Sequence, residues 1–277
     1  MAFRFNFFDE NNAIDQSSDA VETRRPVEVQ VDLADTEIPI GVLTRDQVQA
    51  CCAVSNVPYL EHRASKDVTI RMINGGELSA QDQVAKVTDV LPGHYEGGLK
   101  IWECSYDAID YLSRMDPPTR LLDLGCGSGL VGIWALMTWP NVHVTFHDLN
   151  LSVLQSATAP NVALNDTQSV ARSDFVYGPW DKSLQNLTSQ GRYDLISTAD
   201  TLYDPDAMRH LHDLLLNVLT PNGRAIIAAK RFYFGVGGGV SSFVALVNQL
   251  GKAKVQVVAS FEDGGSNIRD VLEFRLA

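Results

Sequence analysis

The stretch LLDLGCGSGL, residues 121–130, joins an apolar run to three glycines at alternate positions, Gly125, Gly127 and Gly129. A buried strand that runs into such a loop usually holds a ligand against bare backbone. The spacing does not match the dinucleotide fingerprint G-x-G-x-x-G, because Leu130 stands where its third glycine would be. A P-loop would end in Gly-Lys-Ser or Gly-Lys-Thr, which this loop lacks. The loop is therefore expected to bind a ligand through a group other than a phosphate.

Strand and helix patterns alternate on both sides of this loop. Such alternation predicts an α/β fold with a mostly parallel, doubly wound sheet that helices cover on both faces. Ligands in such sheets lie at the carboxyl ends of the strands. A helix over 153–164 is expected to break at Pro160. The strand patterns cover residues 120–125, 142–150, 193–203, 222–230, 253–261 and 271–276, and the main helix patterns cover 102–115, 130–139, 208–219 and 240–250.

Three segments are expected along the chain. Residues 1–36 are polar and acidic without a sustained period, which predicts disorder. Residues 37–90 form an N-terminal extension packed on the core, with a short helix capped by Thr44 and a strand at DVTIRMING. Residues 91–277 form the ligand-binding domain.

Composition excludes several classes of function. A net charge of −12 argues against direct binding to the backbone of nucleic acids. No apolar run is long enough to span a membrane, and the N-terminus lacks a secretory signal pattern. The four cysteines lack paired spacing, so we expect free thiols and a location in the cytoplasm and nucleus. The six histidines show no metal-ligand spacing, so no metal site is expected. The protein is expected to be a monomer.

The run DLGCGSG resembles the first motif of S-adenosylmethionine-dependent methyltransferases with a Rossmann-like fold. In that family the glycines let the backbone approach the amino-acid part of the cofactor. Asp148 ends the next strand, where a carboxylate can accept hydrogen bonds from the ribose hydroxyls. Asp123 orients the loop or reaches the ammonium group of the cofactor. Asp174 and Trp180, around the next strand, are expected to contact the adenine, Trp180 by stacking.

Four further segments give a narrower resemblance. They are similar to the eukaryotic protein-histidine N-methyltransferases, which methylate one histidine of the third protein of the large ribosomal subunit. The resemblance implies a seven-stranded sheet that ends in an antiparallel hairpin, and a basic ribosomal protein as the substrate. The segments are residues 95–112, 148–165, 197–206 and 228–243.

The same resemblance implies roles for particular residues. Trp102 and Glu103 would help to hold the methionine end of the cofactor. The acid-x-x-aromatic element, which begins at Asp200 and ends at Tyr203, would lie beside the axis of methyl transfer. Histidine-directed members usually carry glutamate at the position of Asp200, while lysine-directed relatives often carry aspartate. A protein lysine therefore stays an alternative target.

The chemistry of the two targets differs. A histidine side chain with a pKa near 6.5 is mostly neutral at pH 7 and needs only the right tautomer, which Asp200 would fix by accepting the far ring N–H. A lysine with a pKa near 10.4 must first lose a proton. Enzymes that methylate amino groups of nucleobases carry two prolines in this element, and the run DTLY has none. A non-catalytic, cofactor-binding chaperone of a ribosomal protein is the other alternative.

Overall fold

The computed structural model describes most of the chain from Ile38 onwards. The segment 1–36, for which disorder was predicted, lies outside the described residues, as does part of the expected extension over 37–90. The described residues are 38–53, 57–76, 78, 90–91, 94–234, 237–262, 264 and 267–277.

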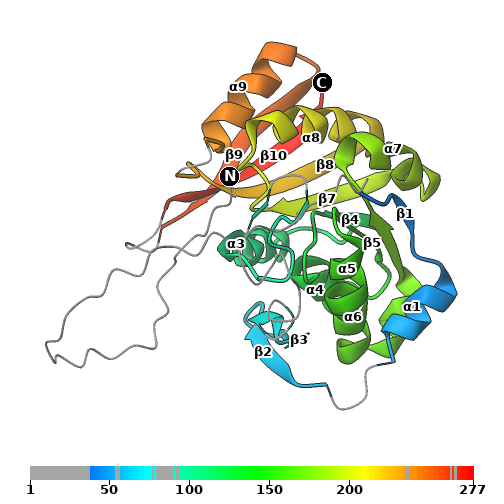
Figure 1. Ribbon diagram of the computed structural model, residues 1–277. Helices are drawn as coiled ribbons and strands as arrows, with labels where there is room; N and C mark the ends of the chain where they lie inside the picture. Colours follow the sequence, from blue (N-terminus) through cyan, green and yellow to red (C-terminus); the bar gives the residue numbers. More distant parts are fainter. Residues whose placement is uncertain are drawn as a thin grey trace, which may run out of the picture.

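Eight of the described strands form one mixed sheet in the order β1-β6-β5-β4-β7-β8-β10-β9 (Figure 1). The central strands β6, β5, β4, β7 and β8 run parallel, while β10 lies antiparallel to both β8 and β9. The predicted Rossmann-like fold with its antiparallel C-terminal hairpin is confirmed, with the short strand β1 added at one edge. The strands are β1 Gly41–Val42, β2 Tyr59–Arg63, β3 Thr69–Ile73, β4 Arg120–Leu124, β5 His143–Asp148, β6 Ser173–Tyr177, β7 Tyr193–Ala199, β8 Leu219–Lys230, β9 Ala253–Phe261 and β10 Arg269–Leu276.

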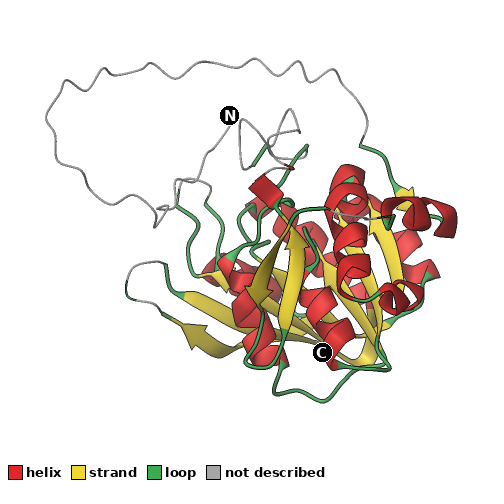
Figure 2. Ribbon diagram, turned by 90° about the horizontal axis from the view of Figure 1, so that it is seen from below, coloured by secondary structure: helices red, strands yellow, loops and turns green. Residues whose placement is uncertain are grey.

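Helices lie in two layers, one on each face of the main sheet (Figures 1 and 2). Alternate residues of a central strand face opposite layers. On β4, Leu121 belongs to the core formed with α3, α4 and α6, whereas Leu122 belongs to the core formed with α7, α8 and α9. No helix in the described part of the chain is long and apolar enough to cross a membrane. The helices are α1 Arg45–Cys51, α3 Glu103–Leu112, α4 Leu130–Thr138, α5 Leu151–Val153, α6 Ala159–Asn165, α7 Trp180–Ser189, α8 Pro205–Val218 and α9 Val240–Leu250.

The helical segment after β5 corrects one expectation. It does not break at Pro160. Instead, α5 continues through the π-helical turn η1 (Leu154–Thr158) into α6. Proline lacks the N–H that an interior helical position donates. In this structure Pro160 lies in the first turn of α6, directly after the wider turn, where that N–H is not needed.

The N-terminal extension packs on the sheet and on one helix layer. Helix α1 begins at a capping box, in which the Thr44 side chain accepts the N–H of Gln47 while the Gln47 side chain accepts the N–H of Thr44. The predicted cap and the predicted strand β3 are both present. From the β2–β3 hairpin, Ile70 and Met72 are buried in the same core as α3 and α4.

A buried ion pair joins α3 to β10. Arg269 Nε lies 2.6 Å from Asp107 Oδ2, and the two residues are 9% and 6% exposed. Arg269 begins β10 opposite Lys230, the last residue of β8, so the pair lies near the carboxyl edge of the sheet. The pair therefore fixes the position of α3 relative to the strands.

Breaking this pair should destabilise the fold strongly. Asp107→Ala leaves a buried guanidinium without its carboxylate, so the free energy of unfolding should fall by about 3 kcal/mol. The matched control is Asp110→Ala in the same helix, which removes an exposed pair with Arg114 and should cost less than about 0.5 kcal/mol. Denaturant titration measures both variants. Equal losses would show that the buried pair does not hold α3 in place.

Candidate functional site

The glycine loop, residues 125–129, joins the end of β4 to the start of α4. Gly125 and Gly127 adopt the left-handed conformation, with φ of 66° and 52°. A Cβ atom on Gly127 would lie 2.8 Å from the carbonyl oxygen of Gly98, and one on Gly125 would lie 3.0 Å from Thr201 Cγ2. Both positions therefore need glycine, for the backbone conformation and for the close packing around it.

Polar side chains from the helical segment after β5 fix this loop. Thr158 Oγ1 donates to the carbonyl of Gly127 at 2.6 Å, and Asn161 Nδ2 donates to the carbonyl of Ser128 at 3.0 Å. The Oδ1 atom of the buried Asn161 also accepts the N–H of Ile73 in β3 at 2.8 Å. Thr158 closes the π-helical turn, a feature that is frequent at functional sites. One amide side chain thus connects the β2–β3 hairpin to the glycine loop.

Asp148 ends β5 beside the glycine loop. Its Oδ2 accepts the N–H of Gly127 at 2.9 Å and its Oδ1 accepts the N–H of Asn150 at 3.0 Å. Burial raises the pKa of Asp148 to about 6. Because each carboxylate oxygen has a second acceptor position, Asp148 can still accept two ligand hydroxyls.

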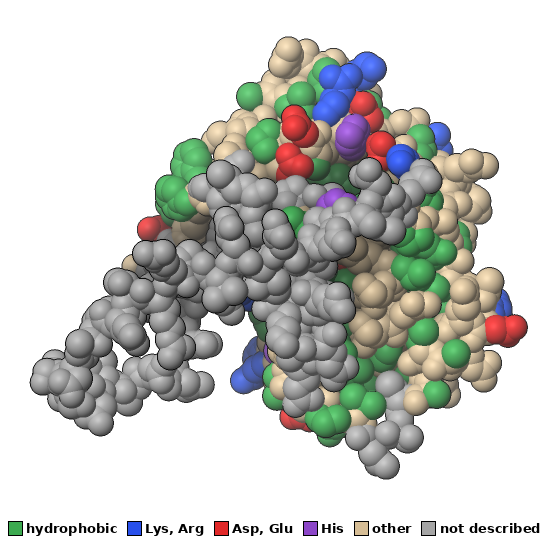
Figure 3. All heavy atoms as spheres, in the orientation of Figure 1, with side chains coloured by type: hydrophobic (Ala, Val, Ile, Leu, Met, Phe, Trp, Pro, Cys, Tyr) green, Lys and Arg blue, Asp and Glu red, His purple; other side chains and the backbone are tan. Residues whose placement is uncertain are grey.

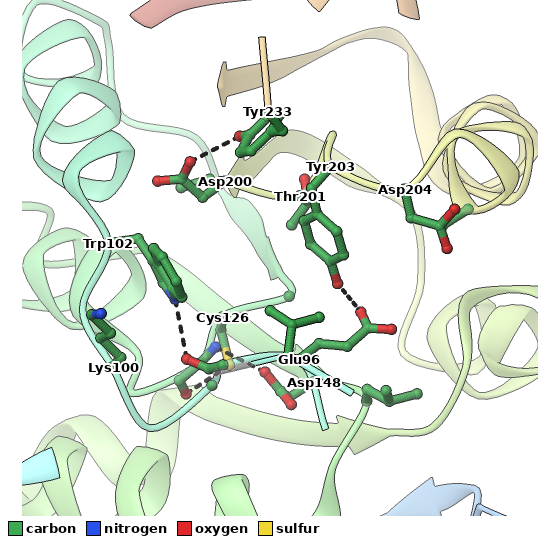
Figure 4. A pocket seen from close by; sticks show the side chains of 18 of the residues that line it. Glu96, Lys100, Trp102, Cys126, Asp148, Asp200, Thr201, Tyr203, Asp204 and Tyr233 are labelled. Carbon is green, nitrogen blue, oxygen red and sulfur yellow. Dashed lines mark hydrogen bonds between the residues drawn. The ribbon is translucent and has the colours of Figure 1, made fainter. Parts of the chain in front are cut away.

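A cavity of about 930 Å³ lies at the carboxyl ends of the parallel strands. This volume is near the upper limit of about 1,000 Å³ for small-molecule sites, so a second group can enter beside a ligand. In Figure 4, Asp148 and Cys126 lie at one end of the pocket, Asp200 and Tyr233 at the other, and Tyr203 between them. The wall includes these predicted site residues: Trp102, Gly125, Gly127, Asp148, Trp180, Asp200 and Tyr203.

Asp200 directly follows β7 and has an unusual backbone. Among the described residues it is the only one other than glycine with a positive φ, 56°. Tyr233 donates its hydroxyl to Oδ1 at 2.8 Å, and the N–H of Cys104 in α3 donates to Oδ2 at 3.1 Å (Figure 4). A left-handed conformation outside glycine costs of order 1 kcal/mol and concentrates at functional sites. The two donors hold the Asp200 carboxylate in the cavity wall.

Glu96, Lys100 and Trp102, from the segment before α3, make further contacts in the wall. Tyr203 donates its hydroxyl to Glu96 Oε2 (Figure 4). The ammonium groups of Lys100 and Lys230 lie 4.8 and 5.5 Å from the ring centroid of Trp102. Both distances are in the range of cation–π attraction. Trp102 is therefore an anchored part of the wall, on the side of Asp200.

Asp174 corrects one prediction. It is the second residue of β6, far from the carboxyl end of that strand, and its Oδ2 lies 2.6 Å from His143 Nε2 at the start of β5. It does not line the cavity. The sequence places Asp174 near Trp180, but the last three residues of β6 and the turn at 178–179 separate the two. An adenine contact by Asp174 is therefore not supported.

Three more predicted residues lie behind the wall. Asp123 Oδ2 accepts the N–H of Gly132 at 2.8 Å, so Asp123 orients the start of α4, and burial raises its pKa to about 7. Gly129, with φ of 87°, caps the same helix. Glu103 Oε2 lies 3.3 Å from the ammonium of Lys230, which itself lines the cavity. These residues support the wall and do not form it.

Among the described residues, no group of three or more His, Cys, Asp or Glu is placed to hold a metal ion.

Sequence reasoning missed five residues of the site. The resemblance marked the segments that contain the missed residues, but no pattern indicated that Tyr233 reaches a carboxylate 33 positions away. The missed residues are Glu96, Thr158, Asn161, Lys230 and Tyr233.

Known proteins resemble this chain in sequence. The family described as lysine methyltransferase matches residues 92–234. A histidine protein methyltransferase 1 homolog of Dictyostelium discoideum is 40% identical over 189 residues, which are 67% of this chain and 60% of that protein. The homolog of Rattus norvegicus is 32% identical over 250 residues, 79% of this chain and 69% of that protein. The chain thus spans between 60% and 69% of the length of these two relatives.

A solved structure supports the fold assignment. Mitomycin 7-O-methyltransferase is 17% identical in sequence, with a TM-score of 0.50 over 74% of this chain and 61% of that chain. At this identity the likeness concerns the fold alone.

The cavity fits S-adenosylmethionine. Asp148 offers a buried carboxylate beside the glycine loop, and the hydrogen bonds described for it come from backbone N–H groups. Trp180 offers a flat apolar surface and lines the same space. Gly125 and Gly127 add no side chains to that side of the cavity. We therefore expect Asp148 to hold the ribose, Trp180 to lie beside the adenine, and the loop to face the methionine part.

The pKa of Asp148 makes cofactor binding depend on pH. Below about pH 6 the free protein holds a proton on Asp148, and a ribose bound to the carboxylate must displace it. Affinity for S-adenosylmethionine should therefore rise as the pH increases through about 6, by up to about tenfold per unit, and level off above about pH 7. Asp148→Asn should bind more weakly and without this dependence. Calorimetry at pH 5 to 8 measures both, and an affinity of the wild type that stays constant with pH would refute the role of Asp148.

Proposed function

The chain belongs to the S-adenosylmethionine-dependent protein methyltransferases, in the family that includes the histidine protein methyltransferase 1 homologues, and we propose that it methylates a histidine of the third protein of the large ribosomal subunit. The observation that carries this proposal is the Asp200 carboxylate in the wall of the cofactor-sized cavity. The hydrogen bonds described for its two oxygens come from Tyr233 and Cys104. A carboxylate oxygen has two acceptor positions, so a substrate group can bind Asp200 beside these donors.

The proposed reaction uses the neutral side chain of the target. S-adenosylmethionine, when bound, supplies a methyl group on a positively charged sulfur. Asp200 accepts the N–H of the far ring nitrogen, which leaves the lone pair on the near nitrogen directed at the methyl group. After transfer the ring is a cation, which Asp200 stabilises until the far N–H loses its proton to solvent. The enzyme thus contributes mainly position and orientation.

The same wall serves a lysine target less well. The lysine alternative is favoured by the family description and by aspartate at position 200. Six acidic side chains and two lysines line the cavity, and a surplus of carboxylates raises the pKa of any amine that enters. The same carboxylates raise the pKa of an imidazole, but from about 6.5, so much more of it stays neutral than of a lysine that starts near 10.4 and must lose its proton. The charge balance therefore supports histidine.

The acidic wall also supports a basic protein as the partner. The whole chain carries a net charge of −12. Asp181 in the first turn of α7 and Asp206 in the first turn of α8 are exposed and line the cavity. On the face shown in Figure 3, acidic side chains over α8 lie among basic and histidine side chains. Opposite charge around the entrance would attract a ribosomal protein and orient its basic segments.

Product analysis tests the proposed function. The purified chain is incubated with S-adenosylmethionine labelled in the methyl group and with the purified third protein of the large subunit, and the product is hydrolysed in acid. Methyl-histidine as the labelled amino acid would support the proposal. Methyl-lysine would promote the alternative target, and no transfer to this protein would exclude it as the substrate.

The charge of the entrance should affect substrate affinity. Asp206→Asn removes an exposed charge at the cavity, so KM for the ribosomal protein should rise about two- to fivefold at low salt, with kcat unchanged. Added salt should reduce the difference by screening. The matched control is Asp46→Asn, an exposed acid in the first turn of α1, which should leave KM unchanged. Equal KM values for the two variants would contradict the proposal that acidic side chains at the cavity entrance attract the substrate protein.

A further inference from the structure

The hydroxyl of Tyr233 has a fixed direction. Tyr233 lies in the segment after β8 and is 8% exposed. Its oxygen accepts the backbone N–H of Lys230 at 3.2 Å, so its own proton points to Asp200 Oδ1, 2.8 Å away. Its ring packs edge to face on Tyr203, with centroids 6.2 Å apart. The hydroxyl therefore acts as a rigid donor to one oxygen of Asp200.

A second donor lies close to the same oxygen. The ammonium of Lys230, a residue 5% exposed, is 4.0 Å from Asp200 Oδ1 and 3.3 Å from Glu103 Oε2. A charged donor bonds a carboxylate more strongly than a hydroxyl does. If Oδ1 lost the Tyr233 hydroxyl, the carboxylate would rotate toward the ammonium. A contact ion pair of this kind would turn the carboxylate and so misalign the acceptor position that a substrate ring N–H needs.

The rest of the Asp200 environment leaves little other freedom. The left-handed backbone fixes the direction of the Cα–Cβ bond. The N–H of Cys104 holds Oδ2 at 3.1 Å. The Asp200 side chain can still rotate about its Cβ–Cγ bond. The donor at Oδ1 determines the orientation that the carboxylate takes.

We propose that Tyr233 is a positioning residue that keeps Asp200 Oδ1 from forming a direct hydrogen bond with the Lys230 ammonium, 4.0 Å away, so that the carboxylate can orient the target histidine. This inference rests on the proposed function, because Asp200 has an imidazole to orient only when the target is histidine. Tyr233 contacts neither the target nor the cofactor in this scheme. It acts through Asp200, and its loss should lower the rate of transfer without weakening cofactor binding.

Removal of the hydroxyl gives the first arm of the test. Tyr233→Phe should lower the single-turnover rate on the ribosomal protein by about tenfold or more, while the Kd for S-adenosylmethionine stays within about twofold by calorimetry. The matched control is Tyr193→Phe, which removes another buried tyrosine hydroxyl, one that donates to the carbonyl of Leu187 at 3.3 Å near the amino end of β7. Its rate should stay within about twofold of the wild type. A Tyr233→Phe rate within twofold of the wild type would overturn the inference.

Removal of the competing charge gives the second arm. In the Tyr233→Phe background, Lys230→Gln takes away the ammonium that would capture Asp200. The double variant should then be at least about threefold faster than Tyr233→Phe alone, although it carries one more change. Simple structural damage predicts the opposite, a further loss. A double variant that is no faster than Tyr233→Phe would overturn the inference.

Product analysis keeps the two proposals separate. Wild-type protein that forms methyl-lysine would refute the histidine target and with it the need for an oriented imidazole. Wild-type protein that forms methyl-histidine, together with unimpaired Tyr233→Phe, would refute the role of Tyr233 alone. The two failures therefore give different results in the same experiment.

Discussion

The site depends on one constraint, the left-handed backbone at Asp200 where β7 ends. An extended residue at this point would direct its side chain to one face of the sheet, whereas at Asp200, with φ of 56°, the carboxylate lies in the cavity wall. The conformation persists because two donors from separate elements, Cys104 in α3 and Tyr233 after β8, bind the carboxylate. The buried pair between Asp107 and Arg269 fixes the helix that supplies the first donor. Local strain is thus balanced by tertiary hydrogen bonds.

At the cofactor end of the cavity, hydrogen bonds from separate elements also hold the backbone in place. The glycine loop packs so closely that the backbone at Gly127 touches the segment before α3. The side chains of Thr158 and Asn161 donate hydrogen bonds to the carbonyls of the loop. The Asn161 side chain also accepts a backbone N–H of the β2–β3 hairpin. The hairpin, although it pairs with no strand of the main sheet, therefore contributes to the position of the loop. The buried amide of Asn161 thus connects the N-terminal extension to the glycine loop by hydrogen bonds.

The sequence was sufficient for the fold because the strand and helix patterns are strongly periodic and the glycine loop marks the edge where ligands bind. It was also sufficient to place Asp148, the last residue of β5, and Asp200, directly after β7, at the same edge, since the carboxyl ends of parallel strands meet there. It failed for Asp174, because nearness to Trp180 along the chain says nothing about which end of β6 faces the ligand. It also missed Tyr233 and Asn161, whose partners are distant in sequence. Such contacts depend on tertiary packing, which no local pattern encodes.

The pH dependence of single-turnover methyl transfer, for the wild type and for Asp200→Asn, tests the central claim most directly. If Asp200 orients a neutral imidazole, the wild-type rate should rise with deprotonation of the target and level off above about pH 7 to 8. Asp200→Asn keeps a similar shape without the charge, so its plateau should be at least about tenfold lower, with cofactor affinity nearly unchanged. A rate that still climbs at about pH 9.5, or equal plateaus for the two proteins, would contradict the account.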